Sequence, residues 1–271
     1  MPEVSELFIY PIKSLGGIRV LAANVTDRGF EFDRRWMLVD SDNRFLSQRE
    51  CPQMALLQVV LSDAGLIVQH KISKEATANI PLSIESKETV TVKVWSDRCD
   101  ALLVSDELDE WFSDMLSLHC RLVHMPDSSK RRVDTQYALN HEITSFSDGY
   151  PFLIIGQSSL NDLNARLKRP LPINRFRPNI VFTGGEPFQE DMMEHFSISD
   201  IEFFGVKKCA RCVIPTIDQD SGIKSNEPIK TLAAYRQSEN KIYFGQNLLH
   251  KGEGKVTVGD RIMIHQPGEM N

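Results

Sequence analysis

The sequence places two cysteines three residues apart in the basic segment Lys207-Lys208-Cys209-Ala210-Arg211-Cys212. Cationic neighbours favour a thiolate, which is the form of cysteine that binds metals and attacks electrophiles. Residues 201–206 are rich in β-branched and aromatic side chains and predict a strand, and Pro215 limits further sheet pairing. We therefore expect both cysteines where a strand gives way to a loop.

Such a pair is compatible with half of a zinc site, a redox dithiol, two structural cysteines or one functional cysteine. Structural zinc usually takes two further Cys or His ligands at short spacing. The remaining cysteines, Cys51, Cys99 and Cys120, are scattered, and the seven histidines stand alone. The absence of a strand–helix–strand pattern around the pair disfavours a thioredoxin-like dithiol. The residues favour a single functional cysteine over the other three possibilities.

Length and composition are those of a soluble globular protein with one large or two modest domains. The chain has 271 residues, of which 41% are hydrophobic and 25% charged. Its net charge of −6 argues against a general nucleic-acid binder. The sequence has no apolar run near the roughly 18 residues that span a bilayer, and its first residues lack the layout of a signal peptide. Five unpatterned cysteines indicate a reducing compartment. We predict a cytoplasmic protein that binds neither nucleic acid nor membrane.

The first half of the chain is predicted to be almost entirely β. Turn formers such as Gly16-Gly17, Asp42-Asn43 and Asp63-Ala64-Gly65 separate short β-prone runs, a spacing that favours a barrel or sandwich. We expect strands at residues 4–10, 18–25, 36–40, 44–48, 56–61, 66–70 and 89–95. Apolar residues at helical spacing predict a helix over 106–118. A further strand is expected over 120–125.

The second half is predicted to mix strands with short helices. The polar stretch 126–132 is predicted to be a domain boundary or a mobile loop. Its basic run Lys130-Arg131-Arg132 is expected to be a solvated loop, with the alternative that it lines a site. We expect strands at 152–155, 241–244 and 255–264, the last broken at Gly259-Asp260, with Gly245-Gln246-Asn247 as a loop. Expected helices are one capped by Ser158 or Ser159, an acidic one over 186–195 and one opened by Pro228. The polar end, 266–271, is expected to fray. The fold class is therefore mainly β with a few helices (α+β).

Three polar clusters could bind an anion. Lys13-Ser14 follows the first strand, and Asp33-Arg34-Arg35 precedes another. Each is either solvated strand-end charge or part of a phosphate clamp, in which Lys supplies a point charge and Arg a bidentate fork. Arg175 and Arg177 alternate with a phenylalanine, so a strand would put both on one face, toward water or an anion. The amides of Gln246 and Asn247 suit either a loop network or recognition of a heterocycle.

Seven motifs, taken together, resemble a known family. They are YPIKS, FDRRW, the arginine of SQRE, DGYPF, NRFRPN, KCARC and FGQN, and they occur in this order from about residue 3 to residue 262. The combination resembles the MOSC family, in the branch of the mitochondrial amidoxime-reducing component and its bacterial relatives. That branch carries an N-terminal β-barrel domain before the MOSC barrel.

The resemblance implies two β-barrel-like domains that bind molybdenum cofactor. Residues 1–125 would form the N-terminal MOSC-associated barrel and residues 126–271 the MOSC domain, with the first strands contributing to the cofactor pocket. Cys212 would be the thiolate ligand of molybdenum and Asp148 a catalytic group near the metal, whereas Cys209 has no ligand role. The implied cofactor-binding residues are Lys13, Ser14, Arg34, Arg49, Arg177, Asn179, Arg211, Gln246 and Asn247.

The resemblance also implies a reaction. The family's amidoxime-reducing branch uses molybdenum cofactor to reduce N-hydroxylated substrates such as amidoximes, hydroxylamines and N-hydroxylated bases, and the cofactor carries the chemistry. This chain ends at Asn271 without the C-x₄-C-x₂-C pattern of a plant-type ferredoxin domain. We therefore expect no iron–sulfur cluster in this chain. The expected electron source is a separate donor of ferredoxin or cytochrome type, unless the chain is truncated before a ferredoxin domain.

Two alternatives stay open at this point. In the first, Cys212 carries a persulfide and the protein is a sulfur carrier for the cofactor. In the second, the barrel binds a pterin-like ligand without turnover. A family-level association with pyridoxal phosphate binding is a further expectation.

Overall fold

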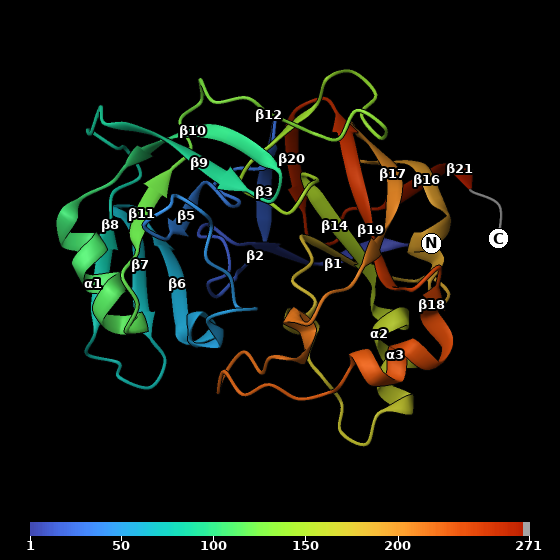
Figure 1. The fold of residues 1–271 in the computed structure, drawn as a ribbon. Coiled ribbons are helices and arrows are strands. Elements are labelled where there is room, and N and C mark those ends of the chain that lie inside the picture. Colours follow the sequence, from blue (N-terminus) through green and yellow to red (C-terminus); the bar gives the residue numbers. More distant parts are fainter. Residues whose placement is uncertain (268–271) are drawn as a thin grey trace.

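The computed structural model describes residues 1–267; residues 268–271, which belong to the end that we expect to fray, lie outside the described residues. Within residues 1–267 the chain is mainly strands, with three α-helices. The expected fold class is confirmed. Figure 1 shows two groups of curled sheets side by side, with the first and last strands in the same group. No helix of the described residues has both the length and the apolar content needed to cross a bilayer.

One group is built on a nine-stranded sheet that joins both ends of the chain. Its order is β2–β1–β15–β14–β19–β17–β16–β21, with β18 on β19. The strands are β1 (Glu3–Ile9), β2 (Ile18–Val20), β14 (Phe152–Gly156), β15 (Ile180–Thr183), β16 (Met193–Ile198), β17 (Ile201–Ala210), β18 (Gln237–Ser238), β19 (Lys241–Lys251) and β21 (Ile262–Pro267). Leu7 of β1 pairs with Ile180 of β15, so the start of the chain completes the sheet of the second half. The predicted division between residues 125 and 126 stays a prediction.

The other group contains smaller antiparallel sheets. Two of them have the orders β5–β11–β10–β9 and β6–β7–β8, and β12–β13 is a short pair. The short sheet β20–β3–β4 instead packs on the nine-stranded sheet, where Val25 and Val256 share a core with Leu7. The strands are β3 (Ala22–Thr26), β4 (Gly29–Phe30), β5 (Trp36–Val39), β6 (Leu57–Ser62), β7 (Gly65–His70), β8 (Thr77–Ile80), β9 (Thr89–Val94), β10 (Asp97–Leu103), β11 (Arg121–His124), β12 (Arg131–Arg132), β13 (Ile143–Thr144) and β20 (Gly254–Thr257). Alternating apolar residues of strands β5 to β11 fill cores of their own, which include Trp36, Leu57 and Val92.

The three α-helices are α1 (Asp106–Leu116), α2 (Gln157–Arg166) and α3 (Ile229–Arg236). Short 3₁₀ turns span Pro52–Leu56, Ile173–Arg175, Gln189–Met192 and Ile214–Thr216. The predicted helix at 106–118 corresponds to α1, whose first turn is capped by the Ser105 hydroxyl accepting from the backbone N–H of Leu108. Phe112 is among the α1 residues that bury against the sheets. The helix predicted after Pro228 corresponds to α3.

Several local predictions in the first half are wrong. Residues 44–48 form no strand and make only isolated bridges, such as that between Val39 and Phe45. The strand expected over 18–25 is interrupted at Leu21, so that β2 joins the nine-stranded sheet and β3 joins β20 and β4. Strands β8 and β10 were not predicted. Both contain residues of low β-propensity, such as Asn79 in β8 and Asp97 and Asp100 in β10, which weaken the sequence signal of a strand.

The second half brings three further corrections. The acidic helix expected over 186–195 is a single 3₁₀ turn, because pairing with β17 and β21 draws the following residues into β16. The N-cap of α2 is Gly156, and the Ser159 hydroxyl donates instead to the Glu190 carboxylate at 2.7 Å. The loop expected at Gly245-Gln246-Asn247 is the middle of β19, where Gly245 adopts a φ of +85° that a side chain would rarely allow.

Candidate cofactor site

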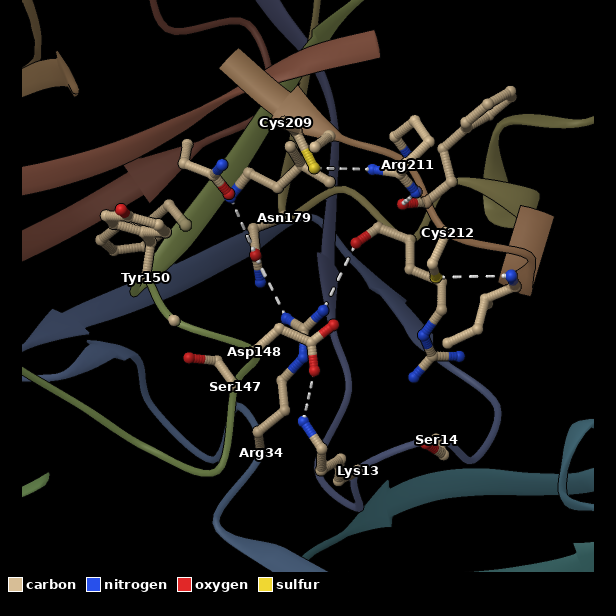
Figure 2. A pocket seen from close by; sticks show the side chains of 18 of the residues that line it. Lys13, Ser14, Arg34, Ser147, Asp148, Tyr150, Asn179, Cys209, Arg211 and Cys212 are labelled. Atoms are coloured by element: carbon tan, nitrogen blue, oxygen red, sulfur yellow. Dashed lines mark hydrogen bonds and ion pairs between the residues drawn. The ribbon is translucent and has the colours of Figure 1, made fainter. Parts of the chain in front are cut away.

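A cavity opens where the loops of the two sheet groups meet (Figure 2). Its lining comes from the loop after β1, the segments before β5 and before the first 3₁₀ turn, residues 147–150, the entrance of β15, and the end of β17. Ten of the eleven residues predicted for the site line it: Lys13, Ser14, Arg34, Arg49, Asp148, Arg177, Asn179, Arg211, Cys212 and Asn247. The ordered motifs therefore converge in space, although they are spread over most of the chain.

The cavity is strongly cationic in a protein of net negative charge. Five of its lining residues are cations, Lys13, Arg34, Arg49, Arg177 and Arg211, and one, Asp148, is a carboxylate. The whole chain carries a formal charge of −6. Cations gathered against the overall charge focus a positive potential on the cavity. The cavity therefore favours an anionic ligand.

The cysteine segment forms one wall of the cavity (Figure 2). Strand β17 ends at Ala210 after an irregular register against β19, so Cys212 lies just beyond the strand as expected. Arg211 Nη1 donates to the Sγ of Cys209 at 3.1 Å. Among the described residues, the hydrogen bond of the Cys212 Sγ comes from the backbone N–H of Ile214 at 3.5 Å. The Arg211 guanidinium thus engages Cys209, while the Cys212 thiol lines the cavity without a side-chain hydrogen bond from residues 1–267.

A buried lysine and a carboxylate face each other on another part of the wall. Lys13 Nζ donates to Asp148 Oδ1 at 2.6 Å and to the Phe146 carbonyl at 2.7 Å, and Arg49 Nη2 approaches Asp148 Oδ2 at 3.5 Å. Burial lowers the pKa of Lys13 to about 8, against the opposing charge of Asp148. Enclosure alone would raise the pKa of Asp148, but the charges of Lys13 and Arg49 hold it well below its usual range. The Asp148 carboxylate is therefore ionised at neutral pH.

Two arginines enclose a buried tyrosine ring beneath the cavity. The guanidinium carbons of Arg34 and Arg177 each lie 4.3 Å from the ring centroid of Tyr10. Arg34 Nη1 donates to Asp33 Oδ2 at 2.6 Å and to Asn179 Oδ1 at 3.1 Å. These contacts fix both guanidinium groups, since each is held by an aromatic face as well as by hydrogen bonds.

Three of the cavity residues have strained backbone conformations. Ser14, Arg34 and Arg177 have φ values of +69°, +50° and +57°, in the left-handed region that residues other than glycine seldom adopt. All three line the cavity. Strained residues persist where surrounding contacts determine the conformation, and they cluster at functional sites. The strain is a feature independent of charge that makes this cavity a candidate functional site.

The prediction that Arg175 and Arg177 share a strand face is wrong. Arg175 ends a 3₁₀ turn and donates to Asp218 Oδ2 at 2.8 Å and to the Pro215 carbonyl at 2.9 Å. The left-handed conformation at Arg177 turns the chain, so that its side chain lines the cavity. Arg175 instead holds the segment that follows Cys212.

Gln246 lies outside the cavity lining, in disagreement with its predicted place in the site. Gln246 and Asn247 are neighbours on β19, so their side chains point to opposite faces. Asn247 lines the cavity and its Nδ2 donates to the Lys207 carbonyl at 3.1 Å. Gln246 is buried on the other face.

Arg131 is an important residue that the sequence did not single out. Its side chain is only 3% exposed, which corrects the prediction of a solvated basic loop over 126–132. Arg131 Nη1 donates to the carbonyls of Ser145 and Ser147 at 2.9 and 2.7 Å, and its Nε donates to Asp97 Oδ2 at 2.9 Å. Arg131 therefore holds the loop that carries Asp148. A run of three basic residues gives no signal that its middle member is buried.

The side chains that line the cavity suit a metal ion that is already bound to an organic cofactor. Residues 1–267 contain no group of three or more His, Cys, Asp or Glu side chains placed to hold a metal ion. Burial raises the pKa of Cys99 and Cys120 to about 11, and these thiols lie away from the cavity. Two partly exposed thiols, Cys209 and Cys212, line the cavity among cations and amides. Such a set fits an anionic cofactor whose own sulfur atoms complete the coordination of the metal.

The chain is similar to known proteins over most of its length. Residues 1–119 match the MOSC N-terminal beta barrel domain and residues 141–263 match the MOSC domain. The chain is 31% identical over 281 residues to mitochondrial amidoxime-reducing component 1 of Homo sapiens, covering 96% of this chain and 82% of that protein. It is 32% identical over 277 residues to mitochondrial amidoxime reducing component 2 of Bos taurus, with the same coverage.

Two more distant similarities accompany these relatives. The molybdenum cofactor sulfurase of Oryza sativa subsp. japonica is 30% identical over 293 residues, covering 97% of this chain and 35% of that protein. The crystal structure of YuaD from Bacillus subtilis is 10% identical with a TM-score of 0.46, covering 97% of this chain and 94% of that one. The two domain matches and the relatives that share most of their length with this chain agree. The chain belongs to the MOSC family, among its members that carry an MOSC N-terminal β-barrel domain.

Proposed function

We propose that the protein is a molybdenum-cofactor-dependent oxidoreductase that reduces N-hydroxylated compounds such as amidoximes, hydroxylamines and N-hydroxylated bases. The observation that carries the proposal is one cavity in which the thiol of Cys212 and the ionised carboxylate of Asp148 are surrounded by five cations. The similarity to amidoxime-reducing components over 96% of the chain supports the same conclusion.

The proposed anchor for the cofactor phosphate is the group Lys13, Ser14, Arg34 and Arg49. Lys13 and Arg34 are already held by Asp148 and Asp33, so little side-chain freedom is lost when an anion binds. A hydroxyl and charged nitrogen donors are the groups that bind phosphate oxygens in proteins. The side-chain amides of Asn179 and Asn247 offer donors and acceptors for a pterin edge.

Cys212 is the proposed protein ligand of molybdenum, because a thiolate is a soft donor and metal binding keeps it deprotonated. When bound, the cofactor would supply the two electrons that convert an N-hydroxyl compound to the parent nitrogen base and water. Those electrons would come from a separate ferredoxin- or cytochrome-type donor. Arg175 positions the Cys212 segment through its bonds to Pro215 and Asp218.

Lys13 and Asp148 are the proposed proton-handling pair. Reducing an N-hydroxyl group to the base and water consumes two protons, which must reach a nitrogen and a departing oxygen. The Asp148 carboxylate is ionised and can accept a hydrogen bond from the N–OH group, while Lys13 has a pKa of about 8 and can return a proton near neutral pH. Their 2.6 Å hydrogen bond connects the two groups directly.

The test is reduction of an amidoxime by cofactor-containing protein supplied with a chemical reductant. The parent protein is expected to convert benzamidoxime to benzamidine, and Cys212→Ser to lose at least about a hundredfold in rate, as when a metal ligand or its support is removed. Cys209→Ala serves as the control and should retain most of the rate. If Cys212→Ser kept the parent rate with molybdenum bound, the proposal would be wrong.

A second function is favoured by the similarity to a molybdenum cofactor sulfurase, of which the matching region covers 35%. In that case Cys212 would carry a persulfide and would transfer sulfur instead of binding molybdenum. Cyanide-labile sulfur on Cys212 in molybdenum-free protein would favour this function. A cytoplasmic location and an association with pyridoxal phosphate stay predictions.

A further inference from the structure

A strained tryptophan stands at the edge of the cofactor cavity. Trp95 occupies the turn between β9 and β10 with a φ of +56°, and its side chain remains 43% exposed. A bulky residue in the left-handed region is an outlier, and the conformation persists only where contacts enforce it. An exposed aromatic ring held in a strained conformation is unusual for a surface turn.

Three contacts hold the Trp95 indole, and two of them come from residues of the cavity. The Arg49 guanidinium carbon lies 4.5 Å from the indole centroid, and the indole Nε1 donates to Asp148 Oδ1 at 3.4 Å. The Phe45 ring meets the indole edge-on, with centroids 4.9 Å apart. The ring is therefore fixed in place, while much of its surface stays open to a ligand.

Trp95 also lines a groove that leads into the cofactor cavity. The groove runs from Trp95 past Asp148, Gly149 and Tyr150, and these last three residues line the cavity as well. Figure 2 shows Asp148 and Tyr150 on one segment at the side of the cavity. A ligand in the groove would lie against Trp95 and reach the cavity at the Asp148 carboxylate.

The charges of the groove differ from those of the cavity. Three acids, Asp97, Asp134 and Asp148, balance three bases, Arg131, Arg132 and Lys207, in its lining. The cavity has five cations and one carboxylate. The groove therefore suits an uncharged molecule, whereas the cavity suits an anion.

We propose that Trp95 forms the aromatic wall of the substrate subsite and selects planar aromatic or heteroaromatic N-hydroxylated compounds. The substrate ring stacks on the exposed indole surface, and the N–OH group donates to Asp148. The assignment rests on the proposed function, and it defines which members of that substrate class bind well. Stacking on a fixed indole adds affinity that a nonplanar group of equal size does not gain.

The experiment is calorimetric binding to cofactor-containing protein without an electron donor, so that no turnover occurs. The probes are benzamidoxime and acetamidoxime, which share the N-hydroxyamidine group and differ in the ring. Trp95→Ala is expected to weaken benzamidoxime about tenfold and acetamidoxime less than about twofold, while Trp95→Phe keeps most of the ring preference. Ile72→Ala removes another exposed apolar side chain and should change neither affinity. Equal losses for both probes, or no loss for either, would overturn the assignment.

A second measurement uses the unaltered protein and does not depend on the folding of a variant. Benzamidoxime is expected to bind about tenfold more tightly than cyclohexanecarboxamidoxime, whose ring has similar size but no flat face. Equal affinities would exclude ring stacking. Ring-selective binding without reduction would contradict the proposed function and leave the subsite intact, whereas reduction without ring selectivity would contradict the subsite alone.

Discussion

The two sides of the cavity contribute different chemistry. Residues 13–49, within the region that matches the MOSC N-terminal beta barrel domain, line it with one hydroxyl and three cations, Lys13, Arg34 and Arg49. Residues 147–247, within the MOSC match, add the carboxylate of Asp148, both thiols and two amides, together with two arginines. The first side can hold an anion and supplies the proposed proton donor Lys13, but it adds no thiol or carboxylate to the cavity lining. The proposed metal ligand and the acceptor for the N–OH group come from the second side.

Neither side is formed without the other, because the contacts that orient their side chains cross between them. Lys13 binds Asp148, Arg34 binds Asn179, and Arg177 Nη1 donates to the Leu15 carbonyl at 2.7 Å. The first side, residues 13–49, is called the anchoring side, and the second, residues 147–247, the reactive side. The anchoring side therefore holds side chains of the reactive side in place before any ligand binds. Substitutions on the anchoring side should reduce retention of the cofactor, whereas substitutions on the reactive side should reduce turnover.

The largest effect is expected on the reactive side. Asp148→Asn removes the charged acceptor for the N–OH group and the carboxylate partner of the proton donor Lys13 while keeping the shape of the side chain. Turnover of benzamidoxime should fall about 10²- to 10³-fold, the range of general acid–base catalysis. Molybdenum content should stay close to that of the parent, which metal analysis would establish. Asp200→Asn, on the exposed turn between β16 and β17, is the matched control. Parent turnover in Asp148→Asn would remove Asp148 from the chemistry.

On the anchoring side, Arg34→Met should cost stability as well as cofactor. The side chain of Asp33 is 2% exposed, so losing Arg34 leaves a buried carboxylate without its partner, which costs about 3 kcal/mol in the free energy of unfolding. The double variant Asp33→Asn/Arg34→Met should recover most of this stability in denaturant unfolding. It should still lose cofactor, because the cation is absent. Full cofactor content in the double variant would show that Arg34 is not an anchor.

The pKa of Lys13 predicts a pH dependence for anchoring. Above about pH 8 the ammonium is lost, so affinity for an anionic cofactor should fall up to about tenfold by pH 9, as measured by cofactor retention on dialysis. Stability should change in the opposite sense. The folded-state pKa lies below the ordinary value of 10.5, so the unfolded chain binds more protons in this window and the free energy of unfolding rises with pH. Lys13→Arg, which stays charged, should abolish the decline in affinity.

The smallest effects are expected at the cysteines remote from the cavity. Burial raises the pKa of Cys51, Cys99 and Cys120, so these thiols should react slowly with iodoacetamide in the folded protein. Cys120→Ala should cost about 1 kcal/mol of stability and leave molybdenum content unchanged. Mass spectrometry after brief labelling would identify the modified residues. Rapid labelling of Cys99 would contradict the prediction that the buried thiols react more slowly than Cys209 and Cys212, which line the cavity.

The residues of the site could be predicted because their motifs occur in a recognisable order, not because any local pattern identified them. Local patterns did predict a strand before Cys212, although β17 runs four residues beyond the predicted 201–206 and includes Cys209. They failed at Gly245-Gln246-Asn247, where turn-forming residues lie inside β19 because sheet pairing on both sides outweighs their preference.

Other failures come from partners distant in sequence. Arg131 is buried because Asp97 and the Ser147 carbonyl, 34 and 16 residues away, meet its guanidinium. The pairing of β1 with β15 depends on residues more than half the chain apart. A run of charged residues or a short strand does not indicate which distant residues it will contact. Burial and sheet order therefore could not be predicted from the sequence pattern alone.

The most direct test is metal and pterin analysis of the protein made in a host that synthesises molybdenum cofactor. The parent is expected to contain molybdenum and pterin at close to one per chain, Cys209→Ala to match it, and Cys212→Ala to lose nearly all its molybdenum. A parent protein without metal under these conditions, or a Cys212→Ala variant that keeps it, would contradict the assignment of Cys212 as the molybdenum ligand.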